Sequence, residues 1–123
     1  MAKRVAVIGA SNDRRKFGNK AVRAFVRVGY EVFPVNPHES LIEGLRAWRS
    51  VGEIPGPLDM VTFYVPPHVG IGLLDDVAAV RPAEVWLNPG SEDDRLIERA
   101  RALGLEPILA CSIVGAGESP MGY

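Results

Sequence analysis

The chain has 123 residues, of which 47% are hydrophobic and 24% are charged, and its formal net charge is -1. These values are typical of one globular domain and exclude a disordered segment. The near-neutral charge argues against a protein that coats nucleic acid or an anionic membrane, and no apolar stretch approaches the ~20 residues of a membrane span. The single cysteine, Cys111, cannot form an intramolecular disulfide or a thiolate cluster for zinc. We therefore expect one cytoplasmic domain over residues 1–123, with no metal site.

Short apolar segments rich in β-branched residues recur along the chain and predict five strands. The first, "RVAVIGA", is apolar on both faces, which is typical of a buried parallel strand. Pro34 removes one hydrogen-bond donor from the second, which counts against a regular strand there. The strands are expected over residues 4–10, 31–37, 58–65, 83–90 (with a closing turn) and 105–111.

Helical patterns follow the first, third and fourth of these strands. Gly29 and Gly104 supply the left-handed residues that end two of the helices. Ser91 is expected to cap the start of the last helix, with the acidic residues after it placed favourably against the helix dipole. The helices are expected within residues 17–30, 68–80 and 91–104, with an irregular segment over 38–57 and a Gly-rich tail after Cys111.

Strands that alternate with helices through short connections predict right-handed β-α-β units and a parallel sheet covered on both faces. We expect one α/β domain, a Rossmann-like doubly wound fold with a five-stranded parallel sheet in the order 3-2-1-4-5. Ligands of such sheets bind outside the carboxyl ends of the strands, where the strand order reverses beside strand 1. The loops after the central strands are therefore the candidate site.

The loop after the first strand, "GASNDRRKFG", has a pattern suited to phosphate. Gly9 allows a sharp turn, and free backbone N–H groups are expected from there to Gly18, at the start of a helix. Ser11 and Arg14 stand where a dinucleotide fingerprint has its second and third glycines. Arg14 and Lys16, with Arg15 between them, add positive charge. The alternative interpretation is a solvated basic loop.

The loops after the later strands carry weaker signals. The second strand ends in "VNP" without the carboxylate of an NAD site, which leaves NADP open, and the Asn36 side chain is best explained as capping a turn. "VPPH" after the third strand is a rigid wall against which a ligand arm could pack. "NPGS" after the fourth could supply amide groups, although capping explains Ser91.

The sequence contains no recognisable catalytic constellation. His38 and His68 are the only histidines, and no motif pairs either of them with an acid or a nucleophile. Cys111 ends a buried strand, where a free cysteine is commonly inert. There is no metal-binding motif and no Walker lysine. We therefore expect a binding crevice and no catalytic residues.

Three segments together resemble the small stand-alone coenzyme A-binding proteins, which are similar to the nucleotide-binding domain of the succinyl-CoA synthetase α subunit. These segments are "VAVIGASNDRRKFGNKAVRAFVRVGYEVFPVNPHES", "IPGPLDMVTFYVPPH" and "VWLNPGSEDDRLIERARALGLEPI". The resemblance runs from Arg4 to about Cys111. One departure is Ala110, which stands where many relatives have an arginine.

The resemblance implies a Rossmann-like fold with coenzyme A along the carboxyl edge of the sheet. It places the phosphates of this ligand against the first loop, its adenosine or ribose phosphate beside the second, and its pantetheine arm near the third and fourth. The implied residues are, in that order, Gly9, Ala10, Ser11, Arg14, Lys16 and Gly18; Val35, Asn36 and Pro37; Val65, Pro66 and Pro67; and Asn88, Pro89 and Gly90.

Three functions stay open at this point. The first is a nucleotide-binding module that binds coenzyme A or an acyl-CoA and has no catalysis of its own. The second is a small NADP-dependent reductase. The missing third glycine of the dinucleotide fingerprint and the short chain count against it. The third is a subunit of a complex that uses coenzyme A, since the exposed sheet edge allows a homo-oligomer or a protein partner.

Overall fold

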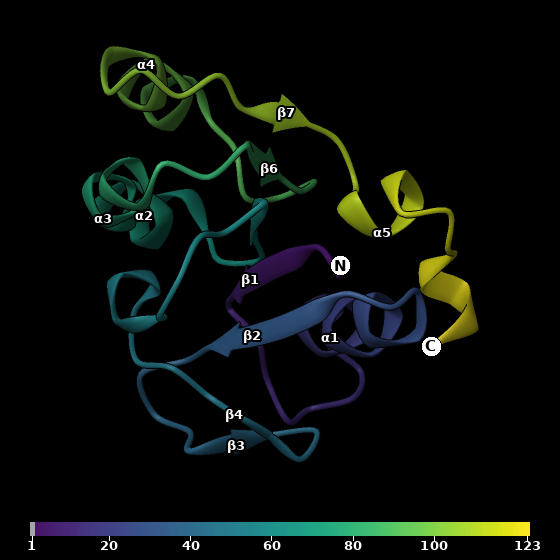
Figure 1. The fold of residues 1–123 in the computed structure, drawn as a ribbon. Helices are drawn as coiled ribbons and strands as arrows, with labels where there is room; N and C mark the ends of the chain where they lie inside the picture. The colour runs from purple at the N-terminus through teal and green to yellow at the C-terminus, as the bar shows by residue number, and fades with distance from the viewer. Residues whose placement is uncertain (1) are drawn as a thin grey trace.

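A parallel five-stranded sheet lies at the centre of the computed structural model, which describes residues 2–123 (Figure 1). Outside this sheet, two strands of two residues each form an antiparallel hairpin. The sheet strands are β1 Arg4–Ile8, β2 Glu31–Val35, β5 Met60–Phe63, β6 Glu84–Leu87 and β7 Ile108–Leu109, and the hairpin strands are β3 Leu41–Ile42 and β4 Leu45–Arg46.

The strand order of the sheet is β2-β1-β5-β6-β7, and all neighbouring strands are parallel. The predicted α/β class with a five-stranded parallel sheet is confirmed. Beyond β2, Val35 forms an isolated parallel bridge with Trp48. In the numbering of the predicted strands, the order of the sheet reads 2-1-3-4-5, whereas 3-2-1-4-5 is predicted. The strand predicted over 58–65 pairs with β1 and not with β2, whose other side carries the bridge to Trp48.

Helices cover both faces of the sheet (Figure 1). Val22 and Phe25 of α1 are fully buried against one face, together with Ile113 of α5. Leu74 of α3 and Leu96 of α4 are buried against the other face. The helices are α1 Phe17–Arg27, α2 Pro67–Gly70, α3 Leu74–Val80, α4 Asp94–Ala102 and α5 Ser112–Gly115, with 3₁₀ turns η1 Val51–Glu53, η2 Ile71–Leu73 and η3 Pro120–Gly122.

The structure differs from the sequence prediction in several local details. The helix predicted over 68–80 is divided into α2, η2 and α3. The N-cap of α4 is Asp93, whose carboxylate accepts a hydrogen bond from Leu96 N at 2.8 Å, so the prediction of Ser91 as the cap is wrong. Pro34 is accommodated inside β2 because its missing donor faces away from β1, on the side where its carbonyl accepts from Trp48 N. None of the helices described over residues 2–123 is long and apolar enough to cross a membrane.

Candidate functional site

A cleft of about 910 Å³ lies at the carboxyl ends of β1, β2, β5 and β6. Beside β1 the connections pass to opposite faces of the sheet, since α1 covers one face and α3 the other, and doubly wound sheets bind ligands at this point. All of the predicted site residues except Arg14 and Pro67 line the cleft. They are Gly9, Ala10, Ser11, Lys16, Gly18, Val35, Asn36, Pro37, Val65, Pro66, Asn88, Pro89 and Gly90.

Backbone N–H groups without partners meet at one part of this cleft. The amides of Ala10, Ser11, Phe17 and Gly18 donate to no acceptor within residues 2–123, and all four residues line the cleft. α1 begins there without a side-chain cap and without an acidic residue in its first turn. Because a helix N-terminus carries partial positive charge, this arrangement favours an anion.

Two glycines allow α1 to approach the end of β1 closely. Gly9 has a φ of +86°, and a Cβ there would lie 2.5 Å from the carbonyl oxygen of Tyr64. A Cβ on Gly18 would lie 2.2 Å from the carbonyl oxygen of Gly9. Any larger residue at either position would push the loop away from the helix start.

The three cations of the β1–α1 loop (residues 9–16) have different surroundings. Lys16 lines the cleft. Arg14 Nε lies 3.5 Å from Glu43 Oε2 on the β3–β4 hairpin, and Arg15 Nη2 lies 3.0 Å from Asp13 Oδ2. Hydrogen bonds from Arg15 lower the pKa of Asp13 to about 2, so this carboxylate stays charged at neutral pH. The structure therefore places Arg14 against the hairpin and outside the cleft.

Arg49 is a second cation that lines the cleft, and it is not among the residues predicted from the sequence. The hydrogen bond from Asn36 N to Trp48 O, 2.9 Å long, brings this part of the chain beside the end of β2. Its position was hidden because residues 38–57 have no strand or helix pattern, and the bridge between Val35 and Trp48 is a single pair.

The Asn36 side chain joins the loops that follow β1 and β2. Its Oδ1 accepts a hydrogen bond from His38 N at 2.7 Å, which confirms the predicted turn. Its Nδ2 donates to Ala10 O at 2.9 Å. This side chain therefore holds the backbone of the cleft in place.

Asn88 anchors the C-terminal segment below the cleft. It is only 2% exposed, and its Nδ2 donates to Thr62 Oγ1 at 2.7 Å while its Oδ1 accepts from Ser112 N at 2.8 Å. Tyr64 Oη lies 3.0 Å from Ser112 Oγ. Burial raises the pKa of Tyr64 above its ordinary value, so its hydroxyl is neutral at physiological pH. The Asn88 side chain is thus committed to internal hydrogen bonds.

The remaining lining residues were also missed as site residues. Val69 and Leu73 come from the divided helical segment, and the sequence signal for them was weak because glycines interrupt it. Ser91 is buried and lines the cleft, and it lies in the turn before Asp93, the N-cap of α4. The other lining residues outside the prediction are Ile8, Phe17, His38, Ser50, Val51, Tyr64, Asp76 and Cys111.

The described side chains offer no metal site. Over residues 2–123, no group of three or more His, Cys, Asp or Glu residues could hold a metal ion. Of the two histidines, His38 lines the cleft and His68 does not. Besides the cations Lys16 and Arg49, the lining residues include the acidic Asp76 and the free Cys111.

The model of the CoA binding domain family matches residues 3–116 of the chain. The chain belongs to this family. A relative in this comparison, the α subunit of ADP-forming acetate–CoA ligase II from Pyrococcus furiosus, is 43% identical over 63 residues. That alignment covers 50% of this chain and only 14% of the ligase subunit, so the chain corresponds to a small part of that protein.

The chain also resembles smaller proteins, which it matches over most of their length. The uncharacterized protein YneT from Bacillus subtilis is 26% identical over 108 residues, which cover 88% of this chain and 80% of YneT. The structure of a conserved hypothetical protein from Pyrococcus furiosus superposes with a TM-score of 0.83 at 32% identity. That superposition covers 94% of this chain and 99% of the other. The predicted resemblance to stand-alone coenzyme A-binding proteins is confirmed.

Proposed function

We propose that this chain binds coenzyme A or an acyl-CoA in the cleft at the carboxyl edge of the sheet. The observation that carries the proposal is that the unpartnered amides of Ala10, Ser11, Phe17 and Gly18 belong to residues that line one cleft together with Lys16. A pyrophosphate carries enough negative charge and enough oxygen acceptors to use all of these donors. Family membership supports the same ligand.

The two ends of the cleft suit the two ends of such a ligand. On the β2 side, His38 and Arg49 provide donors for the phosphorylated ribose of the adenosine part. On the β5 side, Val65, Val69 and Leu73 offer an apolar wall for the pantetheine arm. The ligand would therefore extend from the end of β2, across the start of α1, to the loop after β5. This is the orientation that the sequence resemblance implies.

In this proposal the chain is a binding or regulatory module without catalysis of its own. The Tyr64 hydroxyl supports it, because this residue lines the cleft and its hydroxyl is joined to that of Ser112 in the network around Asn88. Tyr64 is also neutral at physiological pH and does not act as a base. The test is incubation with acyl-CoA thioesters, for which this proposal predicts binding without turnover.

A second candidate is a coenzyme A-binding subunit of a larger enzyme. The observation that favours it is the match to part of a protein named as the α subunit of an acetate–CoA ligase. In this case the chemistry would reside on another chain. Isolation of the native protein with a second chain that has ligase activity would support this candidate, and its isolation without any other chain would argue against it.

Binding of coenzyme A is tested by thermal unfolding and by calorimetric titration. A ligand at a hundredfold excess over its Kd stabilises the folded state by about 2.7 kcal/mol. We expect stabilisation by coenzyme A or acetyl-CoA, and none by NAD(H) or NADP(H). Stabilisation by NADPH alone would overturn the proposal in favour of a reductase, and the absence of any response to coenzyme A would also overturn it.

A further inference from the structure

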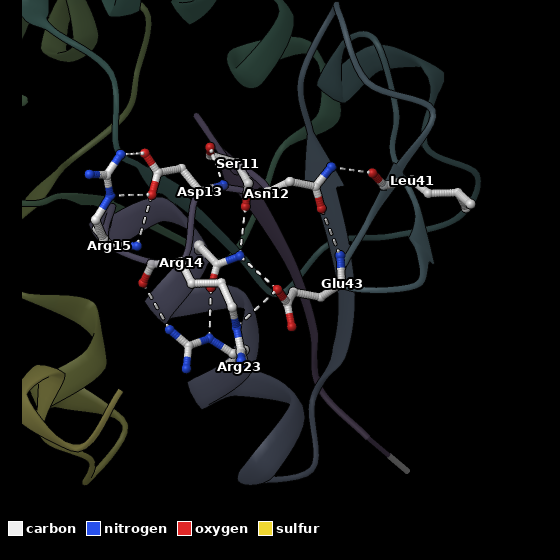
Figure 2. A network of polar contacts seen from close by, with 9 residues as sticks. Ser11, Asn12, Asp13, Arg14, Arg15, Arg23, Leu41 and Glu43 are labelled. Atoms are coloured by element: carbon white, nitrogen blue, oxygen red, sulfur yellow. Dashed lines mark hydrogen bonds and ion pairs between the residues drawn. The ribbon is translucent and has the colours of Figure 1, made fainter.

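The β3–β4 hairpin holds the β1–α1 loop through side chains that lie outside the cleft (Figure 2). Asn12 Nδ2 donates to Leu41 O at 2.8 Å, and Asn12 Oδ1 accepts from Glu43 N at 3.3 Å. One side chain of the loop thus contacts the hairpin at two positions. The position of the loop is therefore tied to the position of the hairpin.

Asn19 of α1 forms a second tie between the same segments. It is fully buried, and its Nδ2 donates to Ser11 O at 2.8 Å and to Glu43 Oε2 at 2.9 Å. Its Oδ1 accepts from Arg23 Nε at 2.7 Å. Both polar atoms of this buried amide are used, so removing the Glu43 carboxylate would leave Asn19 with one acceptor fewer.

These contacts determine the direction of the Ser11 amide. The peptide before Ser11 is held by Asn36, whose Nδ2 donates to Ala10 O, and the peptide after it is held by Asn19 through Ser11 O. In a trans peptide the N–H points opposite to the C=O. Because the Ala10 carbonyl is engaged by Asn36, the Ser11 N–H is directed away from that side chain, and Ser11 lines the cleft.

Glu43 also forms an ion pair with the guanidinium of Arg14. The two groups are 3.5 Å apart, and the Arg14 side chain is 65% exposed, so the ion pair itself contributes little to stability. Arg14 O accepts a hydrogen bond from Arg23 Nη2 at 3.1 Å, which fixes the backbone of this residue as well. Glu43 has a φ of +50°, an uncommon conformation for a residue other than glycine.

We propose that Glu43 and Asn19 are positioning residues, which hold the β1–α1 loop so that its amides face the phosphates of the ligand. The inference rests on the proposed function. It also assigns Arg14 to an exposed ion pair with Glu43 outside the ligand site and leaves Lys16 as the loop's cation for the ligand.

The test is the Kd for coenzyme A and the ligand-free Tm of Glu43→Ala and Glu43→Gln. Glu43→Ala removes one of the two acceptors of Asn19 Nδ2, and we expect its Kd to rise about tenfold. Glu43→Gln keeps an acceptor oxygen, and we expect its Kd to stay within about threefold of wild type. The salt dependence of Kd should stay as in wild type for both, because Lys16 is unchanged; a flatter dependence would mean that Glu43 controls a ligand cation and would overturn the inference.

Three further variants separate the alternatives. Arg14→Ala should leave Kd and its salt dependence unchanged, whereas weaker and flatter binding would show that Arg14 contacts phosphate and would overturn its assignment. Glu106→Ala removes another surface ion pair, with Arg101 at 3.3 Å, and serves as the matched control. If Glu43→Ala does not fold, Asn12→Ala cuts the other tie to the hairpin, and we expect the same weakening.

The outcomes for the proposed function and for this inference are distinct. Wild-type protein that binds no coenzyme A overturns both. Wild-type protein that binds, with hairpin variants that bind equally well, overturns the inference alone. A lower Tm without any change in Kd has the same meaning, since it shows a merely structural role for the hairpin contacts.

Discussion

Replacement of Gly18 by alanine is the sharpest perturbation of the site. The added Cβ would lie 2.2 Å from the carbonyl oxygen of Gly9, whereas real Cβ atoms essentially never come within 3.0 Å of another heavy atom. The backbone fixes the position of the Cβ, and the carbonyl is itself a backbone group, so no side-chain rotation relieves the contact. The loop must move away from the start of α1, and the amides of Ala10 and Ser11 must move with it.

The structure allows the size of the effect to be worked out. Overpacking of a well-packed site costs about 1–3 kcal/mol, and a backbone contact belongs at the upper end, which corresponds to a decrease in Tm of about 10 °C. Loss of hydrogen bonds to a charged phosphate costs about 1.5–3 kcal/mol, so coenzyme A binding should weaken by about 10- to 100-fold. Both effects are expected in Gly18→Ala.

Thermal unfolding and calorimetric titration measure the two effects separately. Gly72→Ala is the matched control, because a Cβ there meets no atom within 4 Å and Gly72 does not line the cleft. We expect its stability to stay within about 0.5 kcal/mol of wild type. A folded Gly18→Ala protein that binds coenzyme A as tightly as wild type would refute this reasoning.

Three more predictions concern side chains around the cleft. Lys16→Ala should weaken coenzyme A binding and reduce its salt dependence in calorimetric titrations at several salt concentrations, whereas Arg14→Ala should change neither. Arg49→Ala should weaken binding of coenzyme A about fivefold and that of dephospho-coenzyme A less, as measured by the same titration; equal losses would contradict a contact with the ribose phosphate. Because the pKa of Tyr64 is raised in the folded state by burial, its contribution to stability is present below its ordinary pKa near 10 and is lost as the pH rises above it. Tyr64→Phe should therefore lose less stability between pH 9 and 11 in denaturant titrations, and an unchanged slope would contradict the burial argument.

Local patterns were sufficient to predict most of the sheet and much of the cleft. Gly9 and Lys16 line the cleft, because the β-α-β rule determines which end of the sheet their loop occupies. Asn36 was predicted as a turn residue, and its bond with His38 N confirms this. In each case the deciding contacts are close in sequence or follow from the topology.

The parts that sequence analysis missed depend on contacts between distant segments. Arg14 has its partner, Glu43, on a hairpin whose strands are two residues long and leave no pattern to detect. Arg49 reaches the cleft through a single bridge at Trp48. At the start of α4, Ser91 and Asp93 are both residue types that cap helices well; Asp93 is the cap, while Ser91 is buried and its N–H bonds to Asn88 O in the preceding turn.

The most direct test of the account is an amide chemical-shift titration of the ¹⁵N-labelled protein with coenzyme A. The account predicts that the amides of Ala10, Ser11, Phe17 and Gly18 show the largest changes and saturate together at one Kd. Changes confined to other parts of the protein, or none at a large excess of coenzyme A, would contradict it.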